Sequence, residues 1–486
     1  MTKYVLLLGG GQMQVPAIEW SHKLGFGVVC FDGKPDVLGQ PLADHFVVCD
    51  ISNSELCLAT ARELRAKFDL RGVLTVGTDF STTVAWVAAG LGLPGIPVEV
   101  AQRAKDKGLM RECFAKAGVA SPDYQVWTPG EPEFFVPCFG VPCVVKPADS
   151  MGARGVQLVT TREELRAALL AAGKHSQSGR VIVEEYIDGP EFSLDAIVEE
   201  GHIHRMGLAD RHIVFPPYFV EIGHTFPTKM DSSQVEALWT EFEKAIRAVG
   251  IERGAAKGDV KLSSKGPMIG EIAARLSGGY MSGWTYPLSS GRSATPWAIE
   301  ACTGLPLEPQ GIDLFRPVAE RAWISIPGVV KSLHGLDAVR ACEGVAEVFV
   351  TLKPGQRMVF PTNNVEKAGN LICTAPSAEG AENLARIARN HLIIELEHPN
   401  SETEDFLFGL DSSRWWFEQA SRCHPALWWQ RAREDHWKDP YGNTIDGLLS
   451  VIGWSEFNPE LRDPRVLRAL FKGGLQGLRY EARLRS

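Results

Sequence analysis

The sequence lacks the features that would place the chain in a membrane or on a nucleic acid. It has no long apolar run, and residues 1–8 lead straight into glycines without a small-residue cleavage site. The net charge is −9, and acidic and basic residues are interspersed rather than gathered in blocks. We therefore expect a cytoplasmic protein with no membrane partner and no nucleic-acid partner.

Paired cysteine motifs are also missing. The ten cysteines are scattered, with no CxxC motif and no metal-finger spacing. We interpret them as reduced core thiols; Cys138 and Cys143 are the closest pair, and a disulfide between them is the less favoured alternative. Since no Ser/His/Asp or Cys/His nucleophile arrangement stands out, the chemistry must come from other residues.

The first hundred residues alternate short apolar runs with helix-like segments. Apparent strands occupy residues 5–8, 27–31, 45–49 and 72–76, and residues 54–68 have helical periodicity. This alternation predicts a parallel sheet wrapped by helices.

Glycines 9–11 follow the first strand, where backbone N–H groups could receive an anion. The GxGxxG spacing is absent because position 14 is Gln14, so a dinucleotide site is the weaker interpretation. Asp32 would bind the ribose in that case, but we favour a role in capping the turn at residues 33–36.

Residues 103–117 predict a helix ending at Gly118. Residues 137–158 then predict a strand, a glycine-rich loop and a second strand. Glycines in such a loop let backbone N–H groups approach phosphate oxygens, and a plain hairpin turn is the alternative. Lys146 at the root of the loop favours phosphate, because a partly buried lysine costs free energy unless an anion neutralises it.

Residues 180–195 predict two strands that meet at a Gly-Pro break. An adenine beside this linker could be bound by backbone groups at residues 185–187, and a carboxylate a few residues on could bind ribose hydroxyls.

Asp259 and Glu271 lie on what the pattern predicts to be two adjacent strands. Because strand side chains alternate between faces, Glu271, Ala273 and Arg275 should point the same way. Two carboxylates beside a guanidinium suit Mg²⁺ and a phosphate. Surface salt bridges are the alternative.

Taken in chain order, these residues resemble the ATP-grasp superfamily over roughly residues 1–400. The resemblance implies an α/β and α+β fold with a Rossmann-like parallel-sheet domain at residues 1–105 and a two-subdomain ATP-grasp domain at 106–310. A β-rich C-terminal domain at 311–405 and a Trp-rich helical extension at 406–486 would follow.

The resemblance also implies which residues form the site. The implied ATP-binding residues are Lys107, Lys146, Gly152, Gly155, Glu184, Glu185, Tyr186, Ile187 and Glu191. Lys107 and Lys146 would contact the phosphates, Glu184 would accept from the adenine amino group, and Glu191 would hold the ribose. Residues 152–155 would close over the phosphates as a lid.

The implied metal ligands are Asp259 and Glu271, which would hold one or two Mg²⁺ ions, with Mn²⁺ as a substitute. Arg275 would hold the transferred phosphoryl group and the developing oxyanion. Many relatives have asparagine where this chain has Ala273, which leaves the second Mg²⁺ open.

Residues 271–275 and 219–227 resemble the branch of L-amino-acid ligases and carnosine-synthase-like enzymes. In that branch His224 and Glu221 would contact an amino-acid substrate, and a surface loop position for His224 is the alternative. The implied activity joins a small carboxylate to an amine with release of ADP and phosphate. An ATP-grasp carboxylase, a purine-pathway ligase and a non-catalytic nucleotide-binding regulator are the alternatives.

Tryptophans concentrate near the C-terminus. Six of the chain's 13 are Trp415, Trp416, Trp428, Trp429, Trp437 and Trp454. We expect a helical appendage that packs these aromatics onto the body. A homodimer interface or a wall over an apolar substrate is the alternative.

Overall fold

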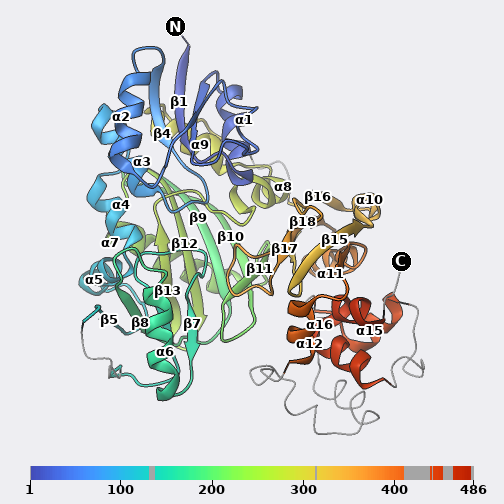
Figure 1. The fold of residues 1–486 in the computed structure, drawn as a ribbon. Coiled ribbons are helices and arrows are strands. Elements are labelled where there is room, and N and C mark those ends of the chain that lie inside the picture. The colour runs from blue at the N-terminus through green and yellow to red at the C-terminus, as the bar shows by residue number, and fades with distance from the viewer. Residues whose placement is uncertain are drawn as a thin grey trace. The chain divides into compact units, whose positions relative to one another are not determined.

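The computed structural model describes residues 2–130, 137–311, 315–409, 438–439, 442–452 and 463–482. These form two compact units, Met1–Pro317 and Val318–Ser486 (Figure 1). The first unit combines a parallel sheet with antiparallel sheets, so the mixed α/β and α+β fold class is confirmed. The finer division into four domains stays a prediction.

The N-terminal part of the first unit is a parallel sheet with strand order β3-β2-β1-β4. Its strands are β1 (Lys3–Leu8), β2 (Gly27–Asp32), β3 (His45–Val48) and β4 (Asp69–Leu74). Its helices are η1 (Gln12–Gln14), α1 (Val15–Lys23), α2 (Ser54–Leu64), α3 (Ser81–Leu91) and α4 (Val98–Lys105). The central strands β1 and β2 are apolar over most of their length because helices cover both faces, as the alternating pattern predicted.

A small antiparallel sheet follows, with strand order β5-β8-β6-β7. It contains β5 (Tyr124–Trp127), β6 (Cys143–Pro147), β7 (Gln157–Val159) and β8 (Val181–Glu185), and α6 (Arg162–Gly173) packs on it. The glycine-rich loop joins β6 to β7, which confirms the predicted strand, loop and strand.

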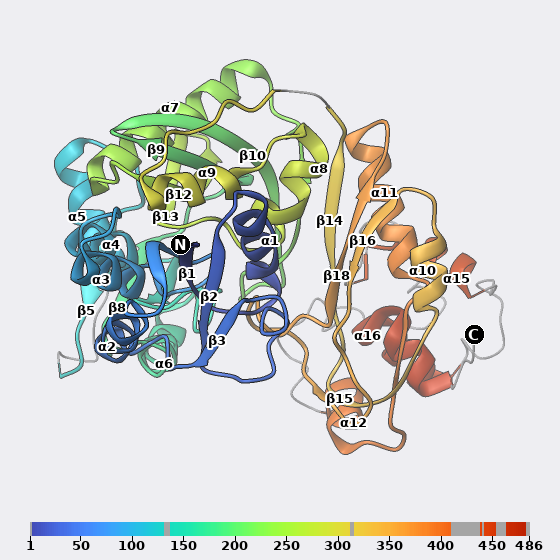
Figure 2. The same cartoon turned by 90° about the horizontal axis from the view of Figure 1, so that it is seen from above.

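A larger antiparallel sheet holds the strands β13-β12-β9-β10-β11 in the first unit. Their bounds are β9 (Glu191–Glu199), β10 (His202–Val214), β11 (Val220–Phe226), β12 (Gly254–Ser263) and β13 (Gly266–Ala273). One face packs Phe192 and Leu194 against Phe242 of α7 (Ser232–Val249), which lies along the sheet in Figure 2. The remaining elements of this unit are α5 (Lys107–Ala117), η2 (Met281–Thr285), α8 (Tyr286–Ser290) and α9 (Ala294–Thr303).

The second unit contains the strand sets β14-β18-β16 and β17-β15-β19. Its strands are β14 (Val318–Trp323), β15 (Gly328–His334), β16 (Val345–Phe349), β17 (Arg357–Met358), β18 (Gly369–Thr374) and β19 (Ile393–Leu396). Its helices are α10 (Leu336–Ala341), α11 (Ala378–Arg389), α12 (Ser401–Phe408), α15 (Ile445–Val451) and α16 (Pro464–Ala482). The β-rich character of residues 318–396 matches the prediction. All six tail tryptophans, and with them the homodimer alternative, lie outside the described residues.

The prediction of a single helix at residues 103–117 was wrong. The chain forms α4 and α5 with Asp106 between them, because Asp106 has an extended backbone and its carboxylate accepts a hydrogen bond from Leu109 N as an N-cap. The break makes Lys107 the first residue of α5.

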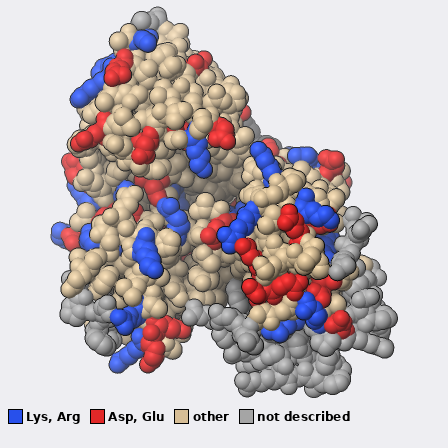
Figure 3. Space-filling model, in the orientation of Figure 1, with Lys and Arg blue, Asp and Glu red and all other residues tan. Residues whose placement is uncertain are grey.

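Asp32 accepts hydrogen bonds from Lys34 N at 2.9 Å and Gly10 N at 2.8 Å, so it caps the turn that follows β2 as predicted. The nine described cysteines, Cys138 and Cys143 among them, carry free thiols. Within the described ranges, no helix has both the length and the apolar character needed to cross a membrane. On the face drawn in Figure 3, basic and acidic side chains are interspersed over the first unit.

Candidate active site

The polar face of the larger sheet collects charged residues from five strands. On β9, Phe192 and Leu194 enter the core with α7, so Glu191, Ser193 and Asp195 lie on the opposite face. Strand pairing extends this face sideways, because β12 lies between β9 and β13. The alternation that builds the core therefore also builds the candidate site.

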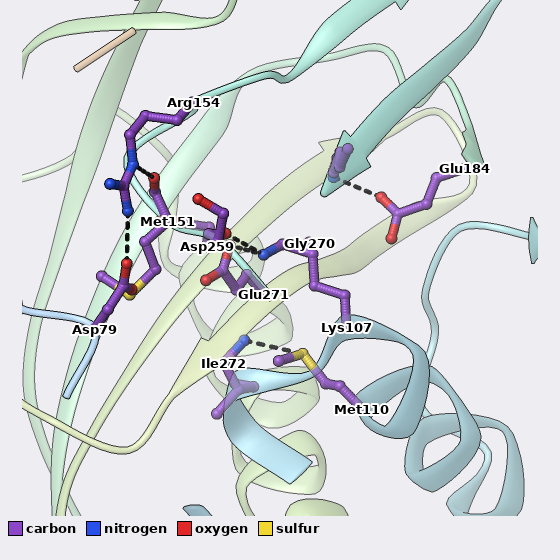
Figure 4. Close-up of polar contacts among 12 residues, drawn as sticks. Asp79, Lys107, Met110, Met151, Arg154, Glu184, Asp259, Gly270, Glu271 and Ile272 are labelled. Carbon is purple, nitrogen blue, oxygen red and sulfur yellow. Dashed lines mark hydrogen bonds and ion pairs between the residues drawn. The ribbon is translucent and has the colours of Figure 1, made fainter. Parts of the chain in front are cut away.

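The predicted metal ligands are direct cross-strand partners, Asp259 on β12 and Glu271 on β13, and Figure 4 shows their carboxylates close together. Asp259 Oδ1 accepts a hydrogen bond from Ser193 Oγ at 3.0 Å. Its Oδ2 contacts the Lys257 ammonium and lies 3.1 Å from Arg211 Nη1. Burial raises the pKa of Asp259, but these two cations outweigh it and hold the pKa below its ordinary value.

Glu271 is the more accessible carboxylate, with 26% of its side chain exposed and Oε2 4.0 Å from Lys107 Nζ. The described residues contain no cluster of three or more His, Cys, Asp or Glu side chains that could hold a metal ion. An accessible carboxylate such as Glu271 nevertheless fits Mg²⁺, which usually takes one or two carboxylates and completes its shell with water and substrate phosphates.

The two predicted phosphate-binding lysines both lie next to the glycine-rich loop. Lys107 Nζ donates to Ser150 O at 2.7 Å, and Lys146 at the end of β6 pairs with Glu184 at 2.5 Å. Gly152 and Gly155 have φ of +71° and +70°, a left-handed conformation that favours glycine. The loop can therefore bring backbone N–H groups near the lysines.

Glu184 lies at the end of β8 with its side chain 1% exposed. Its carboxylate is paired with Lys146 and with Arg111, whose Nη2 lies 2.7 Å from Oε1. Burial raises the pKa of Glu184, but Arg111 and Lys146 lower it to about 2. In this structure Glu184 positions two cations, and its predicted bond to an adenine stays a prediction.

The linker after β8 presents the backbone groups expected near an adenine. Lys261 Nζ donates to Ile187 O at 2.7 Å and lies 5.3 Å from the centre of the Tyr186 ring. Glu185 forms an exposed ion pair with Lys265 at 3.2 Å. This segment is thus held against β12.

Arg211 of β10 connects the predicted ribose, metal and substrate residues. Its guanidinium pairs with Glu191, Asp259 and Glu221, the last at 2.9 Å from Arg211 Nε. Glu221 Oε2 lies 3.7 Å from His224 Nε2, and His224 is 3% exposed. The alternative of a surface loop position for His224 is therefore wrong, because β11 carries this residue into the buried network.

Arg275 lies two residues beyond the end of β13, not within the strand as predicted. Its Nε donates to Thr78 O at 3.2 Å and its Nη1 to Leu276 O at 3.0 Å. Its Nη2 is 3.5 Å from Met151 Sδ in the glycine-rich loop. The guanidinium thus joins the N-terminal sheet region, the loop and the end of β13.

Two further carboxylates, each with a buried oxygen atom, were not predicted as site residues. Asp79 Oδ2 accepts from Arg154 Nη2 at 2.8 Å (Figure 4), and its buried Oδ1 has no hydrogen-bond partner among the described residues. Burial raises the pKa of Asp79 while Arg275 and Arg154 oppose that shift. Asp195 Oδ1 is likewise buried without a partner among the described residues, and burial raises the pKa of Asp195 to about 6 against the Ser277 hydrogen bond and the Lys257 charge.

Sequence reasoning also missed Arg111, Arg211 and Lys257. A signal existed for Arg111, because it lies one helical turn after Lys107 and shares its face. Arg211 and Lys257 are charged residues inside strands, yet only the pairing of those strands shows which carboxylates they meet.

Two parts of the chain match family models. Residues 139–283 match the ATP-grasp domain, and residues 322–397 match the L-amino acid ligase C-terminal domain 2.

Known proteins agree with these matches. An uncharacterized protein of Sinorhizobium fredii is 26% identical over 391 residues, covering 76% of this chain and 78% of the relative. Carnosine synthase 1 of Gallus gallus is 24% identical over 58% of this chain, which spans 33% of that enzyme's length. The crystal structure of an L-amino acid ligase from Bacillus licheniformis has a TM-score of 0.73 at 22% identity, covering 82% of this chain and 99% of the ligase.

The chain therefore contains an ATP-grasp domain. Its C-terminal match is to a domain of L-amino acid ligases, and both matches are typical of ATP-grasp carbon–nitrogen ligases. Both confirm the resemblance drawn from the sequence.

Proposed function

We propose that the enzyme condenses an amino acid with an amine or a second amino acid, using ATP and releasing ADP and phosphate through an acyl phosphate. The observation that carries this proposal is that Glu271, Asp259 and Lys107 lie close together on one polar face. Arg275 contacts the glycine-rich loop beside them. Such a site combines a place for Mg²⁺ with fixed positive charge for phosphate oxygens.

Each part of the site has a task in this reaction. Lys107 and Lys146 neutralise the phosphates, and residues 152–155 close over them to exclude water that would hydrolyse an acyl phosphate. Residues 184–187 hold the adenine and Glu191 the ribose. Glu271, with Asp259 beside it on β12, would hold Mg²⁺, which supplies charge neutralisation to the phosphate oxygens when bound.

A substrate carboxylate oxygen attacks the γ-phosphorus, and ADP leaves. The amine then attacks the carbonyl carbon of the acyl phosphate, loses a proton, and phosphate leaves. Arg275 is placed to stabilise the transferred phosphoryl group and the oxyanion. His224 and Glu221 would bind the amino-acid substrate.

Asp79 is suited to the ammonium group of the amine substrate. Its Oδ1 is buried without a partner among the described residues, and a buried acceptor of this kind gains from a charged donor. Its bond to Arg154 links this position to the glycine-rich loop.

The test is ADP release over a panel of acid and amine pairs, with hydroxylamine added to trap an acyl phosphate as a hydroxamate. Hydroxamate formation that requires both ATP and an amino acid supports the proposal. Bicarbonate-dependent ADP release would support a carboxylase instead, and ATP binding without ADP release over the whole panel would support a regulator.

A further inference from the structure

Lys257 lies at the centre of the polar face. On β12 its backbone pairs with Asp195 of β9 on one side and with Ala273 of β13 on the other. Its side chain is 13% exposed, and its ammonium contacts Oδ2 of Asp259, two residues further along the same strand. A fixed positive charge is therefore built into the carboxylate pair.

Asp259 already has cationic and hydrogen-bonding partners besides Lys257. Arg211 Nη1 lies 3.1 Å from the same Oδ2, and Ser193 donates to Oδ1 at 3.0 Å. A divalent ion placed on this carboxylate would be repelled by both the ammonium and the guanidinium at short range. The methyl side chain of Ala273, opposite Lys257, offers no ligand atom to offset that repulsion.

Glu271 is less closely surrounded by cations than Asp259. It is more exposed than Asp259, and the ion pair it forms with Lys107 is long, at 4.0 Å. A carboxylate with one distant cation and access to solvent can still take Mg²⁺, which keeps several waters and phosphate oxygens.

We propose that the active site uses one divalent ion, held at Glu271, and that the Lys257 ammonium occupies the second cation position, at Asp259. This inference rests on the proposed function, since it requires ATP phosphates to reach this face. A lysine ammonium is a compact charge with three donors, so it can neutralise phosphate oxygens as a second metal ion would.

The test counts Mn²⁺ bound per chain at equilibrium, using the full chain, saturating AMP-PNP and the EPR signal of free Mn²⁺. We expect one ion for the native chain and two for Lys257→Met, which removes the closer of the two cations from Asp259 Oδ2. Lys257→Arg keeps the charge and should stay at one. Lys244→Met is the matched control, because Lys244 forms a carboxylate ion pair with Glu241 at 2.9 Å on α7, and it should also stay at one.

Two ions on the native chain, or one ion on a folded Lys257→Met variant, would overturn the inference. Circular dichroism and the thermal midpoint establish folding, and if Lys257→Met does not fold, the counts for the native chain and Lys257→Arg decide. One bound ion without ADP release for any substrate pair would refute the proposed function and leave the inference standing. Two bound ions together with ligase turnover would refute the inference and leave the proposed function standing.

Discussion

The two faces of the sheet β13-β12-β9-β10-β11 come from the same strands but are held together differently. On one face Phe192, Leu194 and Phe242 are buried in apolar contact. On the other face Arg211 and Asp259 keep 12% and 10% of their side chains exposed, and each meets an opposite charge. Apolar side chains need only shape and volume, whereas a buried charge needs a specific partner. The apolar face should therefore determine stability and the polar face activity.

The largest expected effect comes from removing a charged side chain from the polar face alone. Glu271→Ala and Arg275→Ala should each lower substrate-dependent ADP formation by at least about 10³-fold, because each removes charge stabilisation from the transition state. The thermal midpoint of Glu271→Ala should remain close to that of the native chain, since this carboxylate is partly exposed. Steady-state kinetics and thermal unfolding measure both, and near-normal turnover in either variant would contradict the assignment.

The converse change removes a large side chain from the apolar face. Phe242→Ala leaves a cavity beneath β9 and β12 and should lower the free energy of unfolding by about 3–5 kcal/mol. Its kcat/KM should stay near the native value at temperatures where the variant is folded, because Phe242 contacts the core face. Urea unfolding and kinetics on the same preparation test this, and loss of activity in a fully folded variant would show that the two faces are coupled.

A third prediction compares two buried carboxylates whose pKa values shift in opposite directions. The pKa of Asp195 is raised to about 6, so its contribution favours the folded state at low pH and declines as pH rises from about 4 to 6. The pKa of Glu184 is lowered to about 2, so its stabilisation is complete above about pH 4.5 and is lost as pH falls towards 2.

Free energies of unfolding measured against pH should show these two opposite pH dependences. Relative to the native chain, Asp195→Asn should gain up to about 3 kcal/mol between pH 4 and 6. Glu184→Gln should differ from the native chain by a constant amount above pH 5 and approach it below pH 4. Parallel curves for the native chain and both variants would show that the neighbouring charges do not control these carboxyl groups.

The smallest expected effect concerns the solvent side of α7, which belongs to neither face. Arg247 forms an exposed ion pair with Glu243 at 3.6 Å. Arg247→Ala should change the free energy of unfolding by no more than about 0.5 kcal/mol and leave kcat/KM unchanged, since exposed pairs contribute little. A larger loss of stability would mean that the stability of this region does not reside in the apolar face alone.

Much of the first unit could be predicted because its signals are local. The parallel strands, the loop between β6 and β7, and the alternation that places Glu271 and Ala273 on one face all follow from patterns a few residues long. The predicted helix at 103–117 failed because it ignored Asp106, whose side chain ends one helix geometry and begins another. Arg275 was misplaced for a related reason, since β13 ends at Ala273.

The amino-acid sequence by itself determined the order of the elements, the face on which Asp259 and Glu271 lie, and the resemblance to ATP-grasp enzymes. Only the tertiary structure decided which charges meet. Arg211 reaches Glu191 and Asp259 because β9 lies between β10 and β12, and strand order is a long-range property that residue spacing does not encode. For the same reason the position of Lys257 opposite Ala273 appeared only once β12 and β13 were paired.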